Sequence, residues 1–139
     1  AVFGAPIASD DHADKAIAAA MAMQERLKEI NRIPQDNSVS PIHIGIGIHT
    51  GEVIAGNLGN NQKLEYTVIG ETVNLASRIE DLTKTYQAEI LVSNETWQHM
   101  NNREPKHLTY SSINNVPVRG KVKPITLYRI SSKHWNMGK

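Results

Sequence analysis

The strongest constraint on the fold lies in residues 42–49, where isoleucine occupies every second position and histidine or glycine fills the positions between. An alternation with a period of two is typical of a β-strand, here with one face made entirely of isoleucine. A turn at residues 50–52 and a second apolar run at 53–58 follow, so the pattern predicts a β-hairpin between the two runs. Glycines in both runs leave room for other segments to approach the backbone closely: Gly45, Gly47 and Gly56.

The rest of the chain alternates irregularly between helical and strand patterns. An apolar stripe with spacings of three, four or seven residues predicts a long amphipathic helix that is capped by Ser9 or Asp10 and ends before Pro34. The other expected elements are strands at residues 64–69, 90–92, 108–119 and 125–130, a helix at 70–84, and a short helix capped by Ser93. This irregular order, with hairpins, predicts an α+β fold rather than a doubly wound parallel sheet.

The composition fits one soluble globular domain and excludes several classes of protein. The 139 residues are 40% hydrophobic, which is enough for a single core. Lys and Arg number 15 against 14 Asp and Glu, so a net charge of +1 offers no broad attraction for nucleic acid or an anionic membrane. The absence of cysteine excludes disulfides, zinc–thiolate sites and thiol catalysis, and no apolar run is long enough for a membrane span. Because the chain opens on Ala1 without a methionine, we expect a fragment.

The densest group of polar candidates lies in residues 65–78. On a helix, Asn74 and Arg78 stand one turn apart, and at about 100° per residue both lie roughly 120° from the apolar face. An amide beside a guanidinium can orient a ribose and offset charge that develops on a phosphoryl group. Spacing alone also fits a plain solvated helix face, which is the simpler interpretation.

Three stretches resemble the catalytic domain of the class III adenylyl and guanylyl cyclases: residues 51–59, residues 66–78 with the pattern Gly-x-x-Val-Asn-x-Ala-x-Arg, and Val118-Arg119-Gly120-Lys121. The opening residues 1–6 and 10–13 are similar to a segment from the middle of that domain. The resemblance extends to about residue 130, which divides the chain into a partial catalytic domain at 1–130 and a C-terminal tail at 131–139. It implies a ferredoxin-like α+β nucleotide cyclase fold that is N-terminally truncated here.

The resemblance also implies a reaction and assigns roles within it. In this family the ribose 3′-hydroxyl of a nucleoside triphosphate attacks the α-phosphate, releases pyrophosphate and closes a 3′,5′-cyclic monophosphate. Asn74 would position the ribose, and Arg78 would stabilise charge on the α-phosphate in the transition state. Lys121 matches a lysine that binds the terminal phosphates. From the residues alone Lys121 is an ordinary turn lysine, and Arg119 and Lys123 are equally good candidates.

Thr67 carries the expectation about the base. Adenylyl cyclases of this family have Asp or Thr at the matching position, whereas guanylyl cyclases typically have Cys. A hydroxyl can accept a hydrogen bond from the exocyclic amine of adenine, so Thr67 favours ATP. The alternatives are a guanylyl cyclase, and a threonine present simply for its β propensity.

The family's metal ligands are missing from the chain. Family members hold Mg²⁺ or Mn²⁺ with two aspartates, which we expect upstream of Ala1 together with the base-reading lysine. Asp10, Asp11 and Asp14 match the family's ordinary helix start and cannot be assumed to replace them. His43 and His49 lack the carboxylates that would complete a metal site. The fragment alone is therefore predicted to be inactive and to hold no metal.

Two rivals to the enzyme remain open. The first is a non-catalytic nucleotide-binding or regulatory cyclase-like domain that pairs with an active partner. The second, a ferredoxin-like nucleic-acid binder, is disfavoured because the chain has one Phe, two Trp and four Tyr and no basic stripe.

The resemblance further implies partners and a location. Family members form dimers with composite active sites, so ATP, a second copy and upstream regulatory domains are the expected partners. We expect a cytoplasmic domain, of a larger multidomain protein or of a membrane-attached one. Because strands supplied from before Ala1 would be missing, exposed sheet edges and self-association are also expected.

Overall fold

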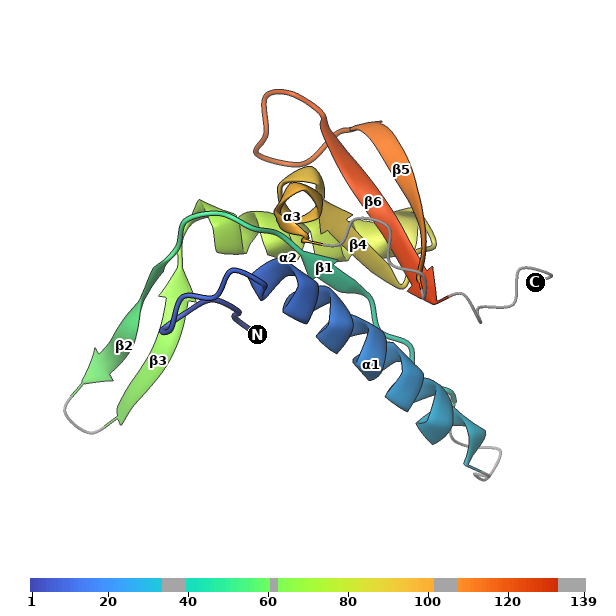
Figure 1. Cartoon of the computed structure of the whole chain (residues 1–139), viewed down its shortest axis with the longest axis horizontal. Coiled ribbons are helices and arrows are strands. Elements are labelled where there is room, and N and C mark those ends of the chain that lie inside the picture. The colour runs from blue at the N-terminus through green and yellow to red at the C-terminus, as the bar shows by residue number, and fades with distance from the viewer. Residues whose placement is uncertain (34–39, 61–62, 102–107, 133–139) are drawn as a thin grey trace.

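The computed structural model describes residues 1–33, 40–60, 63–101 and 108–132, apart from the side chains of 58–60, 63–67 and 132. Three helices and six strands are present in these ranges (Figure 1): α1 (His12–Arg32), β1 (Ile46–Ile48), β2 (Ile54–Asn60), β3 (Lys63–Ile69), α2 (Glu71–Thr85), β4 (Ile90–Ser93), α3 (Asn94–His99), β5 (Leu108–Val116) and β6 (Ile125–Ser132). The mixture of elements is the α+β class that the sequence predicts. None of the helices in the described ranges is long and apolar enough to cross a membrane.

Four strands form the main sheet in the order β1-β4-β6-β5. β1 runs parallel to β4, and the two other pairs are antiparallel. All four residues of β4 are buried, because helices cover both faces of the sheet at its centre. A continuous apolar run in a short strand is the pattern expected when both faces are covered.

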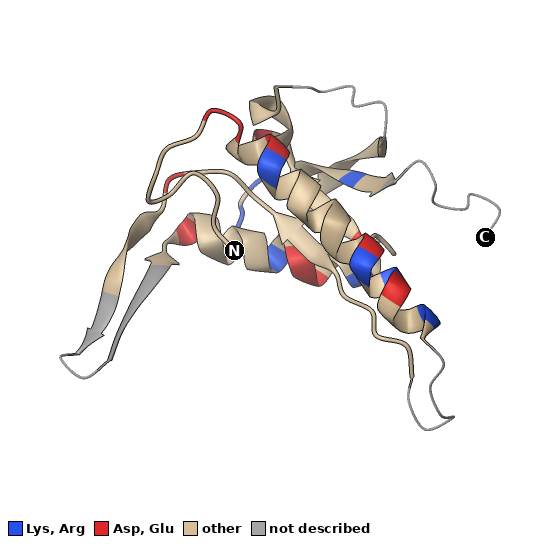
Figure 2. Ribbon diagram, turned by 60° about the horizontal axis from the view of Figure 1, so that its bottom comes forward, with Lys and Arg blue, Asp and Glu red and all other residues tan. Residues whose placement is uncertain are grey.

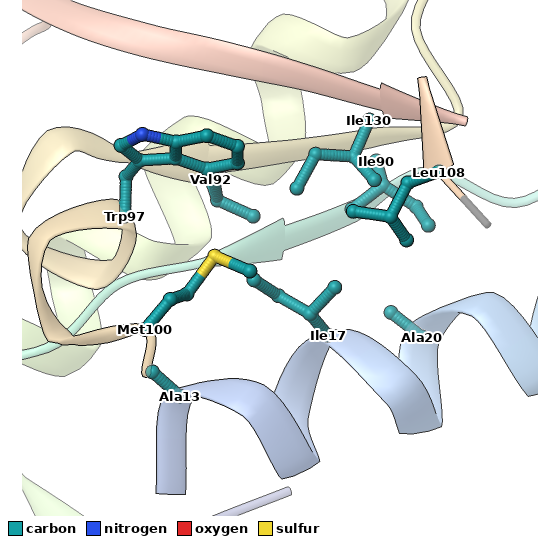
Figure 3. Packing of buried hydrophobic residues seen from close by; sticks show 9 residues of the cluster. All are labelled: Ala13, Ile17, Ala20, Ile90, Val92, Trp97, Met100, Leu108 and Ile130. Atoms are coloured by element: carbon teal, nitrogen blue, oxygen red, sulfur yellow. The ribbon is translucent and has the colours of Figure 1, made fainter. Parts of the chain in front are cut away.

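The two faces of the sheet build two apolar clusters. On one face, α1 and α3 pack against alternate residues of β4 and β6 (Figure 3): Ala13, Ile17, Ala20, Ile90, Val92, Trp97, Met100, Leu108 and Ile130. On the other face, α2 packs against the residues in between: Leu75, Ile79, Leu91, Val116, Val118 and Leu127. The apolar stripes predicted from the sequence therefore position α1 and α2 on opposite sides of the sheet.

The hairpin predicted between residues 42–49 and 53–58 is wrong. β1 pairs with β4, more than forty residues later, at Ile46↔Ile90, and β2 pairs with β3 at Ile54↔Ile69. The β2–β3 hairpin projects away from the main sheet (Figure 1). The alternation in residues 42–49 correctly indicates a strand, but only Ile46–Ile48 are paired. Of the four isoleucines, Ile46 and Ile48 are half-buried against the cluster below α1, whereas Ile42 and Ile44 are exposed. A period of two specifies a face and carries no information about the partner strand.

Two of the three singled-out glycines do allow close approach, and both lie against α2. A Cβ placed on Gly47 would lie 2.8 Å from the backbone oxygen of Ala76 and closer still to the backbone nitrogen of Glu80. A Cβ on Gly45 would collide with the side chain of Thr83. The prediction fails for Gly56, where an added Cβ meets nothing within 4 Å.

Several predicted boundaries need correction. The N-cap of α1 is Asp11 rather than Ser9 or Asp10, and its side chain makes no capping hydrogen bond. The strand predicted at 108–119 ends at Val116, where a bulge disturbs the pairing with β6. The tail assigned to 131–139 begins too early, because Ser131 pairs with Thr109 in the sheet.

The Ser93 cap is confirmed, since its hydroxyl accepts a hydrogen bond from Thr96 N at 3.2 Å. Residues 133–139 and Pro34 lie outside the described residues.

Candidate active site

Helix α2 presents the candidate pair Asn74 and Arg78 on the side away from the sheet. Its apolar face buries Leu75 and Ile79 against β4 and β6, so Asn74 is exposed and the side chain of Arg78 is 31% exposed. Gly70, with φ of +132°, ends the preceding strand and lets the chain turn directly into the helix. The spacing argument for this face therefore agrees with the structure.

The first turn of α2 is fastened to the loop that follows β1. The hydroxyl of Thr72 donates a hydrogen bond of 2.6 Å to the carbonyl oxygen of Glu52. A Cβ on Gly51 would lie 2.6 Å from that same hydroxyl oxygen, so glycine permits the contact. The helix that carries Asn74 and Arg78 is thus fixed at its N-terminal end as well as through its apolar face.

Arg78 is held on two sides. Its Nη1 donates to Oε1 of Glu71 at 2.8 Å, an ion pair along the helix surface. On the other side lies Gly120: a Cβ placed there would be 2.5 Å from Nη1 and 3.1 Å from Cζ of Arg78. Sequence analysis missed both contacts. Glu71 stands seven residues before Arg78, a spacing that could have indicated a pair two turns apart, whereas the Gly120 contact is between distant segments.

The turn between β5 and β6 brings Lys121 to the same region. Gly120 has φ of +86°, which glycine tolerates and which allows the chain to reverse. Lys121 N donates to Val118 O at 3.0 Å to close the turn, and the Lys121 side chain is exposed. Its neighbour Gly120 lies next to Arg78, so the lysine belongs to a turn that packs against α2. The two rival cations, Arg119 and Lys123, are also exposed on this turn.

A hollow of about 300 Å³ adjoins Arg78 between α2 and this turn. Its lining is partly apolar and carries charges of both signs: Arg78, Asp81, Leu82, Pro117, Val118 and Arg119. Figure 2 shows acidic and basic segments alternating along α2. Arg78 and Arg119 could attract an anionic ligand there, and Asp81 opposes them. Asn74 and Lys121 are not among the residues that line this hollow.

Thr67 lies on β3, three residues before the N-cap glycine of α2, and its backbone pairs with Gly56 of β2. Its side chain lies outside the part of the chain that the structure describes. The predicted role of Thr67 in reading the base therefore stays a prediction.

The sequence suggested no role for His49 other than that of a metal ligand. In the structure its ring joins a network of hydroxyl groups at the end of β1. Its Nδ1 lies 2.8 Å from Ser93 Oγ. Thr96 Oγ1 lies 3.1 Å from Ser93 Oγ and 2.9 Å from Thr50 Oγ1. The network connects the end of β1 to the start of α3.

The pKa of His49 is lowered from its ordinary value, chiefly because burial disfavours the charged ring. The carboxylate of Glu95 opposes the shift, and the positive charge of Lys121 adds to it. Glu95 and Lys121 thus act on the imidazole in opposite senses, and burial decides the direction of the shift.

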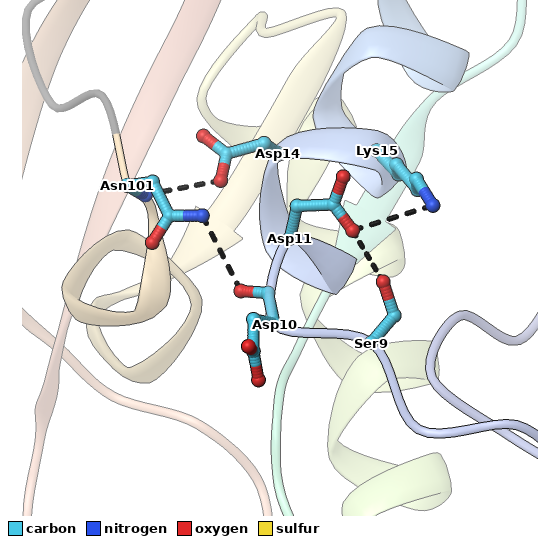
Figure 4. A network of polar contacts seen from close by, with 6 residues as sticks. All are labelled: Ser9, Asp10, Asp11, Asp14, Lys15 and Asn101. Carbon is cyan, nitrogen blue, oxygen red and sulfur yellow. Dashed lines mark hydrogen bonds and ion pairs between the residues drawn. The ribbon is translucent and has the colours of Figure 1, made fainter.

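The described residues do not fit the two-metal site that the resemblance implies. Within ranges 1–33, 40–60, 63–101 and 108–132, no group of three His, Cys, Asp or Glu side chains could hold a metal ion. Asp11, the N-cap of α1, and Asp14, in its first turn, have other partners (Figure 4). Asp11 accepts from the hydroxyl of Ser9, which together with Lys15 at 3.3 Å lowers its pKa. Asp14 accepts from Asn101 N at 3.0 Å.

The comparisons with known proteins identify one family. The model of the adenylate and guanylate cyclase catalytic domain matches residues 1–132. An uncharacterised protein of Mycobacterium tuberculosis (strain ATCC 25618 / H37Rv) is 38% identical over 127 residues, which cover 91% of this chain and 22% of that protein. An adenylate cyclase of Anabaena cylindrica is 36% identical over 127 residues, covering 88% of this chain and 25% of that protein.

A solved structure shows the same fold. The crystal structure of the guanylyl cyclase Cya2 superposes with a TM-score of 0.76 at 31% identity, covering 96% of this chain and 66% of that one. The chain thus spans about a quarter or less of the length of these curated relatives, and less than two thirds of the solved chain.

Proposed function

This chain belongs to the family of adenylate and guanylate cyclase catalytic domains, and from that premise we propose that it supplies one half of a nucleotide cyclase active site. The proposed reaction converts ATP to 3′,5′-cyclic AMP and pyrophosphate in intracellular signalling. The chain contributes the residues that contact the base, the ribose and the phosphates.

The observation that carries this proposal is the contact between α2 and the β5–β6 turn. A Cβ placed on Gly120, the residue before Lys121, would lie 2.5 Å from Nη1 of Arg78, while Asn74 lies one turn away from Arg78 on the same helix. The helix that carries Asn74 and Arg78 and the turn that carries Lys121 therefore approach one another at Arg78, although they lie more than forty positions apart in the sequence. This approach supports assigning the three residues to one nucleotide site.

The proposed roles follow from the chemistry of the side chains. Asn74 holds the ribose through its amide, so that the 3′-hydroxyl faces the α-phosphorus. Arg78 supplies a permanently charged fork to the oxygens that gain charge as the hydroxyl attacks and pyrophosphate leaves. Lys121, an exposed ammonium on a turn, binds the terminal phosphates. Because the described residues offer no metal site, we assign the Mg²⁺ or Mn²⁺ ions to donors outside them and route no step through a metal.

The base and the assembly are parts of the same proposal. Thr67 favours ATP, since its hydroxyl can accept from the adenine amine, although relatives named both adenylate and guanylyl cyclases match this chain. We propose a homodimer in which each composite site combines Asn74 and Arg78 of one copy with the metal-binding part of the other. Upstream regulatory domains and a cytoplasmic position complete the proposal.

The rival function is a non-catalytic cyclase-like domain that binds nucleotide and regulates a partner. The two functions share nucleotide binding and differ in turnover. Cyclic nucleotide production by the complete catalytic domain, with its activity dependent on Arg78, would decide for the enzyme.

A binding experiment tests the nucleotide binding that the enzyme and the non-catalytic regulator have in common. Mg²⁺-ATP is titrated by calorimetry into the wild-type chain, Asn74→Ala, Arg78→Ala and the control Arg26→Ala. Arg26 lies on the exposed surface of α1, where it pairs with Glu29, so this control removes the same charge far from α2. We expect Arg26→Ala to match the wild type and Arg78→Ala to bind about tenfold more weakly. Equal affinity for Arg78→Ala would contradict the proposal.

A further inference from the structure

Glu71 is an acidic residue to which neither the resemblance nor the spacing argument assigns a role. Its Oε1 accepts a hydrogen bond from Nη1 of Arg78 at 2.8 Å, which makes a charge-assisted contact. A guanidinium binds a carboxylate and a phosphate through the same donors. The carboxylate of Glu71 therefore occupies a donor that a phosphate would need.

The position of the pair relative to Asn74 matters as much as the contact. Seven residues are roughly two turns of helix, so Glu71 and Arg78 lie on one face with Asn74 on the turn between them. The ion pair spans the turn that carries Asn74. The contact therefore lies on the helix face proposed to bind the nucleotide.

Gly120 lies on one side of the guanidinium. A Cβ placed on Gly120 would be 2.5 Å from Nη1 and 3.1 Å from Cζ of Arg78, so the turn leaves little room on that side. The free approach to the guanidinium is from solvent and from the adjoining hollow. A phosphate that enters there competes directly with the Glu71 carboxylate.

The pair is weak enough to be displaced. The side chain of Glu71 is 65% exposed and that of Arg78 is 31% exposed, so water and salt screen their attraction. Glu71 also lies in the first turn of α2, where the helix dipole favours a carboxylate even without the arginine. Releasing Glu71 therefore carries little penalty.

We propose that Glu71 gates the nucleotide site: in the nucleotide-free domain its carboxylate stands in for a phosphate on Arg78, and the incoming triphosphate displaces it. This inference rests on the proposed nucleotide function. It makes Glu71 a residue that sets the affinity for the triphosphate by competition, while Arg78 remains the group that touches the substrate.

The first part of the test concerns the ion pair without any nucleotide. Nitrogen-15 spectra of the arginine side chains are recorded for the wild-type chain, Glu71→Gln and the control Glu80→Gln, with Arg78→Lys used to assign the Arg78 signals. A bound carboxylate slows rotation of the guanidinium and separates its Nη resonances. We expect separate signals in the wild type and Glu80→Gln, and averaged signals in Glu71→Gln. Unchanged Arg78 signals in Glu71→Gln would overturn the inference.

The second part measures competition. Mg²⁺-ATP is titrated into the same variants, and into Arg78→Ala with and without Glu71→Gln. The scale of an exposed ion pair predicts that Glu71→Gln binds about threefold more tightly than the wild type. Glu80→Gln, which removes the same charge from the exposed side of α2, should bind as the wild type does. The tightening should vanish when Arg78 is already alanine.

The outcomes separate this inference from the proposed function. If the wild type binds ATP and Glu71→Gln binds it equally or more weakly, the gate is refuted and the nucleotide function stands. If the spectra show the ion pair but no variant binds ATP, the gate is refuted in this chain, and the nucleotide function is decided separately by the turnover of the complete catalytic domain. If Glu71→Gln tightens binding equally with and without Arg78, the effect is general charge repulsion and the gate is refuted.

Discussion

Single residues decide where the guanidinium of Arg78 lies. Glu71 attracts it from the start of α2, and Gly120 limits it from the β5–β6 turn. The position of Arg78, the arginine proposed to act on the α-phosphate, therefore depends on the carboxylate of Glu71 and on the absence of a side chain at Gly120. Both contacts can be changed without altering Arg78.

Gly120→Ala should weaken nucleotide binding because the new Cβ would lie 2.5 Å from Nη1 of Arg78. We expect Mg²⁺-ATP to bind severalfold more weakly, as measured by calorimetry. Gly4→Ala is the matched control: its φ is also +86°, so it carries a similar backbone strain, but its added Cβ meets His12. The same loss of affinity in both variants would show that strain alone, and not Arg78, is responsible.

His49 should make the folded chain less stable in acid. Burial lowers the folded-state pKa below the ordinary value of 6.5, so the unfolded chain binds this proton at a higher pH than the folded chain does. The contribution of His49 is therefore fully present above about pH 6.5 and is lost as the pH falls from there through the folded pKa.

His49→Asn keeps a polar atom near the Ser93 hydroxyl and removes the titration. Urea unfolding at pH 7.5 and 5.5 should show a smaller loss of unfolding free energy for this variant than for the wild type. The other histidines are common to both proteins and cancel in the comparison. An identical loss in both would refute the assignment.

At the scale of elements, the site depends on how closely α2 can lie on β1. Gly45 and Gly47 remove the side chains that would hold the helix off the strand. Thr72 then ties the first turn of α2 to Glu52 in the loop after β1. The polar face of α2 is in this way fixed relative to the sheet and to the β5–β6 turn.

Gly47→Ala should destabilise the fold because its Cβ would meet backbone atoms of Ala76 and Glu80, which cannot rotate away. Overpacking of this kind costs about 1–3 kcal/mol of unfolding free energy, measurable by urea titration. Gly56→Ala is the control, since its Cβ meets nothing within 4 Å, and it should change the stability little. Equal effects of the two substitutions would contradict the packing account.

The sequence predicted those parts of the fold that depend on residues close together in the chain. The apolar spacing along α1 and α2, the Ser93 cap and the buried strand β4 are each visible within a few residues of sequence. The pairing of β1 was not visible in this way, because its partner β4 lies more than forty residues away. An alternating strand can also pair with a parallel or an antiparallel neighbour.

The candidate site divides in the same way. Asn74 and Arg78 could be placed on one face from helical spacing alone. The approach of Gly120 to Arg78 depends on the sheet order, so no local pattern reveals it. The burial of His49 likewise depends on β1 lying beside β4, whose last residue is Ser93.

At the scale of the whole molecule, the main sheet has one partner for β1 among the described residues, namely β4. Ile42 and Ile44, which precede β1 and continue its apolar alternation, are exposed. The chain also spans less than two thirds of the solved relative. An open strand edge beside exposed isoleucines is a surface that favours association with another chain.

Self-association should therefore be measurable by light scattering on the purified chain. We expect a dimer or larger species at micromolar concentration, and a smaller average mass for Ile44→Lys, which places a charge beside the open edge. A stable wild-type monomer at the same concentration would contradict this expectation.

The most direct test of the central claim is cyclic nucleotide production that depends on Arg78. The segment that precedes the matched residues in the adenylate cyclase of Anabaena cylindrica is fused ahead of Ala1, and cyclic AMP is measured with ATP and Mn²⁺. We predict that the unextended chain makes none, that the fusion makes cyclic AMP, and that Arg78→Ala lowers turnover by the factor of about a hundred typical for loss of one transition-state donor. Robust turnover by the unextended chain, or a fusion whose turnover survives Arg78→Ala unchanged, would contradict the account.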